Sequence, residues 1–257
     1  MLSRLEYDLC WEHLRLGEQP TALTIDGHGE TVDERRALLH EAWESLSDKG
    51  LVDRRELDPA LAGRFRVLAR PDREVDARLR LNQYGPRIRA VAAALGRRGV
   101  LAVLTSDFLL LDTVEPHELA SRIVGLLPDR DPPRARSITL RADLLDSAAT
   151  SAGQSATRME VVLRDGGLSW RDAQRVGSVL GNVVGMGQFG ATSRPESGRT
   201  AARRRGSYVV SFYDTPEGRW QFTRRRGWVT LTPADYLRLS RAVAELLNET
   251  AGGPDHR

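Results

Sequence analysis

The chain contains one supersecondary unit twice, as VLAVLTSDFLLLDTVEPHELASRIVGLLP from Val100 to Pro128 and as GRWQFTRRRGWVTLTPADYLRLSRAVAELL from Gly218 to Leu247. In each copy, two segments that predict a β-hairpin precede a Glu-Pro or Thr-Pro helix start and an amphipathic helix. Two copies of such a unit are typical of a duplicated, pseudo-two-fold molecule that works through a shared surface. The repetition favours a binding function over catalysis.

Helix signals lie upstream of the first copy. Apolar spacing near the N-terminus predicts an opening helix that ends at Gly17. Thr31 and Glu34 have capping-box spacing, in which a hydroxyl and a carboxylate each accept a backbone N–H that the helix leaves unpaired. Asp58 and Pro59 are an N-cap and a first helical residue, so a further helix is predicted to begin there.

Strand signals fill the rest of the first half. The segment Pro20 to Asp26 predicts a short strand. From Arg73 onward apolar residues alternate with charged ones, and with Ile88 to Leu95 and the hairpin they predict a four-stranded meander. A helix is expected from Pro116.

The second half repeats this order after a proline-rich stretch. Ser169 and Asp172 have cap spacing and predict a helix, and Asp235 is placed to cap the last one. Strands are predicted at 187–192, 208–213, 220–226 and 228–231.

Together these signals predict an α+β fold with quasi-two-fold duplicated halves, in which a central antiparallel meander sheet is flanked by helical bundles. We expect one domain of 1–257, with pseudo-repeat halves 1–128 and 137–248, a linker at 129–136 and a frayed tail at 249–257. The two sheets are expected to join, because joining covers two exposed edges.

Composition excludes several classes of protein. Cys10 is the single cysteine among 257 residues, so an internal disulfide and a cysteine zinc site are excluded and a reducing, cytoplasmic location is expected. The N-terminus lacks the apolar core of a signal peptide, and no stretch approaches the ~20 apolar residues of a membrane span. Membrane insertion is therefore not expected.

Three motifs suggest catalysis, but the residues around each of them argue against a catalytic site. GMGQFG, at 185–190, matches a dinucleotide fingerprint, but a helix precedes it and a segment that cannot be helical follows, so a glycine-rich helix exit is the better interpretation. His40-Glu41 and His117-Glu118 lack the second histidine of a zinc-protease helix. We predict no enzyme activity, no cofactor and no metal.

A run of arginines suggests a binding surface instead. Residues 194–226 carry nine arginines against three acids. With the neighbouring aromatic residues they could bind nucleic acid, anchor a protein partner or form a solvated hairpin. A helix-turn-helix DNA reader at 31–70 is disfavoured, because eight basic and eight acidic residues cancel there.

Five blocks along the chain carry a resemblance to a known family: ELDPALAGRFRVLARPDREVDARLR (56–80), the stretch 100–128, GMGQFGATSR (185–194), VVSFYDTPEGRW (209–220) and GWVTLTPAD (227–235). They resemble the EspG family, the cytosolic chaperones of the ESX, or type VII, secretion systems of actinobacteria. The resemblance implies a quasi-two-fold α+β chaperone that keeps the apolar tip of the PPE partner of a PE–PPE pair soluble and targets the pair to the secretion machine. By analogy, the surface would use the sheet, the loop 82–86 and the C-terminal helical elements.

The resemblance and interface statistics together give candidate partner-binding residues: Gln83, Tyr84, Tyr208, Phe212, Trp220, Phe222, Arg224, Arg225 and Trp228. The loop 82–86 is shorter than the substrate-gripping loop of mycobacterial relatives. The client is therefore expected to be a PPE-like protein or a small helical hairpin. A nucleic-acid-binding regulator that uses the arginine-rich hairpin is the alternative, and homodimerisation is left open.

Overall fold

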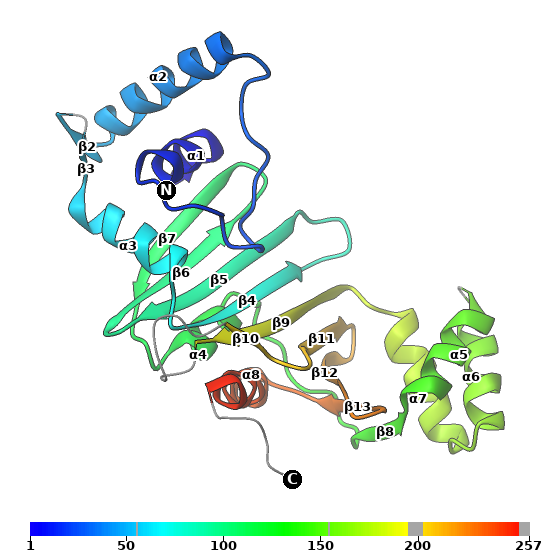
Figure 1. The fold of residues 1–257 in the computed structure, drawn as a ribbon. Helices are drawn as coiled ribbons and strands as arrows, with labels where there is room; N and C mark the ends of the chain where they lie inside the picture. The colour runs from blue at the N-terminus through cyan, green and yellow to red at the C-terminus, as the bar shows by residue number, and fades with distance from the viewer. Residues whose placement is uncertain (55, 154, 195–202, 252–257) are drawn as a thin grey trace.

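One antiparallel sheet of eleven strands runs through the computed structural model, which describes residues 1–257 except 55, 154, 195–202 and 252–257 (Figure 1). The strand order is β1-β7-β6-β5-β4-β9-β11-β12-β13-β8, with β10 paired to β9 off this path. The halves meet where β4 (Arg73–Arg80) pairs with β9 (Gly185–Ser193) over eight residues. The expected joining of the two sheets is therefore confirmed.

The first half begins with a short edge strand and three helices. Its elements are β1 (Leu2–Ser3), α1 (Arg4–His13), α2 (Val32–Asp48), the hairpin strands β2 (Val52–Asp53) and β3 (Glu56–Leu57), and α3 (Pro59–Ala69). The meander follows as β4, β5 (Arg87–Leu95), β6 (Arg98–Leu104) and β7 (Phe108–Val114), and α4 (Leu119–Val124) closes the half. The predicted caps are confirmed, because Thr31 and Glu34 form the capping box of α2 and Asp58 caps α3.

The second half repeats this order. Its elements are β8 (Ile138–Arg141), α5 (Ala142–Ala152), α6 (Ala156–Asp165), α7 (Trp170–Gly181), β9, β10 (Arg204–Arg205), β11 (Val210–Thr215), β12 (Gly218–Arg225), β13 (Trp228–Pro233) and α8 (Tyr236–Ala251). Residues 129–136 between the halves have neither helix nor strand. Just as β1 pairs with β7, β8 pairs with β13.

The helices cover the sheet unequally on its two faces. Successive strand residues face opposite sides, so Ala90 and Ala92 pack with α4 and α8 while Val91 and Ala93 pack with α1–α3. In the second half Phe212 packs with α8, whereas its neighbour Tyr213 faces α5–α7. The register across β5, β4, β9 and β11 shows that the two three-helix bundles, α1–α3 and α5–α7, lie on the same face of the sheet. Helices α4 and α8 lie on the other face (Figure 1).

Three expectations about elements are wrong. The segment 20–26 forms turns and irregular chain rather than a strand: Pro20 accepts the Leu23 N–H at 2.7 Å, and Leu23 is buried in the core. The residues of GMGQFG form the start of β9, not a helix exit. The first residues of the tail are helical, because α8 ends only at Ala251. Arg225 binds the carboxylate of Glu249 in this last turn. The remaining tail residues lie outside the described part of the chain.

Candidate functional site

A groove of 530 Å³ lies on the sheet face that carries both three-helix bundles. Its floor comes from four adjacent strands, β5, β4, β9 and β11, at the junction of the halves. It is lined by Arg78, Leu79, Arg80, Arg87, Ile88, Arg89, Met186, Gly187, Gln188, Ser211 and Tyr213. Four arginines and no acid line the groove, so the surface combines positive charge with apolar area.

Strand register arranges these side chains in two rows across the floor. One row runs Arg89, Arg78, Gln188, Ser211, and the next runs Arg87, Arg80, Met186, Tyr213. Residues directly opposite each other on paired strands share a face, so each row points into the groove. The β5 and β4 side is basic, and the β9 and β11 side is neutral.

Two of the predicted partner-binding residues adjoin this groove. Gln83 and Tyr84 lie at the tip of the β4–β5 loop, which connects Arg80 to Arg87. The Asn82 side chain orders the loop by accepting the Tyr84 N–H at 3.2 Å. Tyr84 is 93 % exposed, so its ring is presented to solvent beside the groove.

Two other predicted anchors are buried, which corrects the expectation. Phe212 and Trp220 are fully buried: Phe212 packs near Phe189 in the core under α8, and Trp220 packs in the core under α5–α7. Helices cover both faces of the second meander at these two positions, so each side chain enters the core on its own face of the sheet. Neither side chain has surface to offer a partner.

Three further predicted anchors do not line the groove, although Phe222 lies directly opposite its Ser211 on the paired strands β11 and β12. Phe222 is half-buried and packs edge-on against Tyr213, with ring centroids 5.5 Å apart. Arg224 makes a two-pronged ion pair with Asp146 of α5, at 2.8 and 2.5 Å. Trp228 is 52 % exposed at the start of β13.

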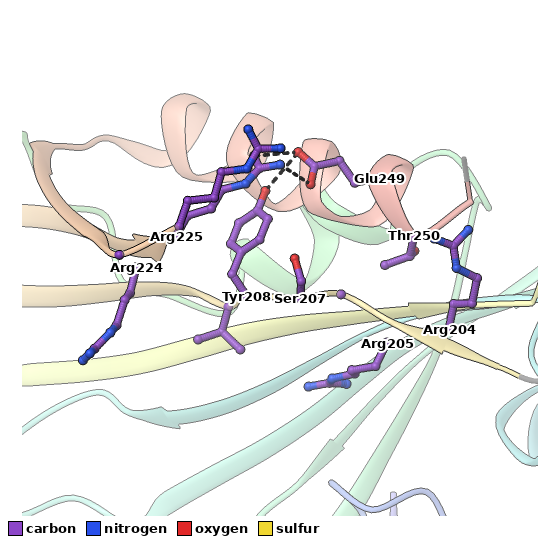
Figure 2. A pocket seen from close by; sticks show the side chains of 12 residues that line it. Arg204, Arg205, Ser207, Tyr208, Arg224, Arg225, Glu249 and Thr250 are labelled. Carbon is purple, nitrogen blue, oxygen red and sulfur yellow. Dashed lines mark hydrogen bonds and ion pairs between the residues drawn. The ribbon is translucent and has the colours of Figure 1, made fainter. Parts of the chain in front are cut away.

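The last two predicted residues meet in a second, larger pocket of 1140 Å³, which Figure 2 shows from close by. Arg225 donates to both carboxylate oxygens of Glu249 on α8, at 3.0 and 3.1 Å. The Tyr208 hydroxyl lies 3.3 Å from the same carboxylate, and the Arg225 guanidinium lies 4.8 Å from the centre of the Tyr208 ring. Burial, followed by the charge of Glu249, raises the pKa of Tyr208. These residues tie the hairpin to α8.

The described arginines of the run 194–226 all interact with other residues of the same chain. Arg203 pairs with Glu74, Arg205 with Asp76, Arg219 with Asp214, Arg224 with Asp146 and Arg225 with Glu249. Arg194, Arg204 and Arg226 also have interaction partners, and Arg199 lies outside the described residues. The charge that suggested nucleic-acid binding is therefore used largely for internal ion pairs.

Sequence reasoning did not find these ion pairs. Glu74 and Asp76 are buried on β4, and their partners lie far away in the sequence, Arg203 just before β10 and Arg205 within it. Desolvation raises the pKa of Glu74 against the opposing effect of Arg203. The alternation of apolar and charged residues along β4 predicts that both carboxylates lie on one face of the strand, but it does not predict which residues pair with them.

The fingerprint GMGQFG has a structural reason for its glycines. A Cβ on Gly187 would lie 2.7 Å from the backbone oxygen of Arg78 and 2.8 Å from the Phe212 ring. On Gly185 it would lie 2.8 Å from the backbone oxygen of Leu81. The glycines let β9 fit between its neighbours, so their spacing gives no support to a nucleotide site.

Two other features are absent from the described residues, a metal-binding cluster and a membrane-spanning helix. Within those residues no cluster of three or more His, Cys, Asp and Glu side chains is placed to hold a metal. No helix in the described part of the chain is long and apolar enough to cross a membrane.

Comparisons with known proteins agree with this architecture. The model of the EspG family matches residues 3–245. The ESX-1 secretion-associated protein EspG1 of Mycobacterium marinum is 25 % identical over 249 residues, which cover 94 % of this chain and 85 % of that protein. The fold is similar to that of the Mycobacterium tuberculosis type VII secretion system chaperone EspG5, solved in complex with a PE25-PPE41 dimer. The TM-score is 0.78 at 18 % identity, over 98 % of this chain and 96 % of EspG5.

Proposed function

We propose that this chain, which belongs to the EspG family, is a chaperone of type VII secretion that binds a PPE-like client. The structure of EspG5 was solved with a PE25-PPE41 dimer, and EspG5 shares this fold over nearly its whole length. The observation that carries the proposal is the open groove between the two bundles, which joins a basic floor to apolar side chains. In this proposal the protein is a cytoplasmic adaptor and not an enzyme.

The groove and the β4–β5 loop form the proposed client surface. Tyr84 is 93 % exposed and Met186 is 40 % exposed, and both lie where strands β4, β5 and β9 meet. Exposed apolar side chains grouped with arginine are typical of protein-binding surfaces. Such a surface would cover the apolar helical tip of a client and keep it from aggregating.

Binding alone would perform this function. A chaperone that binds the soluble folded client shifts the population away from aggregates by mass action. Release at the secretion machine then requires a moderate affinity, which is set mainly by the dissociation rate. The proposed mechanism consequently has no hydrolytic step.

Co-purification from the native host tests the proposal. We expect the tagged protein to recover, in stoichiometric amount, a helical secretion substrate that is identified by mass spectrometry. Recovery of nucleic acid alone, lost at higher salt, would instead support the alternative regulator. Recovery of neither would contradict the chaperone assignment.

Two variants locate the surface. Tyr84→Ala removes the exposed ring beside the groove, and Trp228→Ala removes an exposed ring on β13 as the matched control. We expect Tyr84→Ala to reduce client recovery and Trp228→Ala to leave it unchanged. The reverse pattern would move the client surface from the groove to the last hairpin.

A further inference from the structure

The groove contains an arrangement that folding alone disfavours. Arg78 lies directly opposite Arg89, and Arg80 lies directly opposite Arg87, on the paired strands β4 and β5. Like charges that face each other across two strands destabilise a sheet. Two adjacent Arg–Arg pairs therefore cost folding free energy unless other groups compensate their charge.

Internal ion pairs compensate this charge only in part. Arg78 lies 3.6 Å from Asp76, but that carboxylate is already bound by Arg205. Arg89 donates to the backbone oxygen of Thr24 at 2.7 Å rather than to an acid. Burial is the main cause that lowers the pKa of Arg89, and the nearby guanidinium groups of Arg4 and Arg78 lower it further against the opposing effects of Tyr7 and Asp26.

Arg80 and Arg87 are the least compensated pair. Over the described ranges of the chain, neither side chain forms an ion pair or a side-chain hydrogen bond, in contrast to the described arginines of the run 194–226. Arg87 is exposed and Arg80 is half-buried, at the end of the groove that meets the β4–β5 loop. An anionic group that enters here finds two guanidinium groups side by side.

We infer that the client segment that occupies this groove carries acidic side chains next to its apolar tip, and that Arg80 and Arg87 bind them. The inference rests on the proposed function and adds the chemistry of the client. The opposite side of the floor, with Met186 and Tyr213, is neutral and partly apolar. The acidic side chains therefore lie over β4 and β5, and the apolar ones lie over β9 and β11.

One substitution separates this role from a structural one. Arg80→Glu places a carboxylate opposite Arg87, so the like-charge pair becomes an opposite-charge pair that favours the sheet. We expect the melting temperature to stay the same or rise, while affinity for an acidic client falls by about tenfold or more. Arg238→Glu, on the exposed side of α8 across the sheet, makes the same charge change as a control.

The probes are two synthetic helical-hairpin peptides with one shared apolar tip, flanked by two Glu in one peptide and by two Lys in the other. Fluorescence anisotropy of the labelled peptides against the full chain measures their affinity. We expect the Glu peptide to bind about tenfold or more tighter than the Lys peptide, with a preference that weakens at high salt and is lost in Arg80→Glu but kept in Arg238→Glu.

Several outcomes would overturn the inference. They are equal binding of the two peptides, binding of neither, an undiminished preference in Arg80→Glu, or a single-stranded DNA probe that binds this groove more tightly than the Glu peptide. The client recovered from the host distinguishes this failure from that of the proposed function. If the client binds Arg80→Glu as well as wild type, the charge assignment is wrong and the chaperone proposal stands.

Discussion

The ion pair between Asp214 and Arg219 is the interaction whose loss we expect to destabilise this protein most among its ion pairs. Both residues are almost completely buried, at 0 % and 1 % exposure. Arg219 donates to the two carboxylate oxygens at 2.7 and 3.0 Å and to the backbone oxygen of Pro128 at 2.9 Å. The pair thereby links the β11–β12 hairpin to the chain that connects the two halves.

Asp214→Asn keeps the shape of the side chain and removes its charge. The Arg219 guanidinium then stays buried without a counter-charge, and Arg130, whose Nε lies 3.5 Å from the carboxylate, faces a neutral amide as well. Breaking a buried ion pair from one side costs about 3–5 kcal/mol of folding free energy. For a chain of this size, in which 1 kcal/mol shifts Tm by about 2 °C, that corresponds to a fall in Tm of about 6–10 °C.

Urea unfolding followed by circular dichroism measures the effect, with Asp146→Asn as the control. Asp146 pairs with Arg224 in the same two-pronged geometry, but both side chains are about half exposed, so we expect its loss to lower stability much less than the loss of Asp214 does. The double variant Asp214→Leu/Arg219→Met should recover most of the lost stability, because it leaves no buried charge. If Asp214→Asn and Asp146→Asn unfold at the same urea concentration, burial does not set the strength of this pair.

Three further predictions follow from burial, charge and close packing. Burial raises the pKa of the Cys10 thiol to about 12, so we expect a thiol reagent at pH 8 to label Cys10 only after denaturation; rapid labelling of the native protein would contradict this. Gly187→Ala should destabilise the fold by about 1–3 kcal/mol, because its Cβ meets backbone on β4, whereas Gly181→Ala, with its nearest contact at 3.7 Å, should be neutral or slightly stabilising in thermal melts. Since burial raises the pKa of Glu74 above its ordinary 4.5, the folded protein binds more protons than the unfolded chain just above pH 4.5. Stability from this group falls as pH rises through that window, and Glu74→Gln should flatten the dependence in urea titrations across the same range.

Local signals predicted much of the fold from the sequence. The capping box of Thr31 and Glu34 and the caps at Asp58 and Ser169 are each formed by residues three positions apart, so the sequence contains the whole interaction. The alternation along β4 likewise depends only on neighbouring residues. The prediction of a strand at 20–26 was wrong, because the apolar residues of this segment pack into the core as irregular chain and pair with none of the described strands.

The candidate site was harder to predict because it depends on partners distant in sequence. Arg205 and Asp76 are separated by 129 positions, and Arg225 and Glu249 by 24. A count of charges could not distinguish arginines bound inside the protein from arginines left open to a ligand. Phe212 and Trp220 were chosen for their residue type, but the helices that bury them are not visible in the hairpin itself.

The two sides of the groove differ chemically although the two halves share one architecture. Both halves provide a meander, a three-helix bundle and a closing helix, and they meet at β4 and β9. An exact repeat would give a groove whose two sides are chemically alike. Instead, arginine pairs occupy β4 and β5, while the facing strands contribute Met186, Gln188, Ser211 and Tyr213. Packing against α4 and α8 does not require this difference, since all of these side chains point away from those two helices. The asymmetry is therefore the feature that would orient a bound client across the two halves.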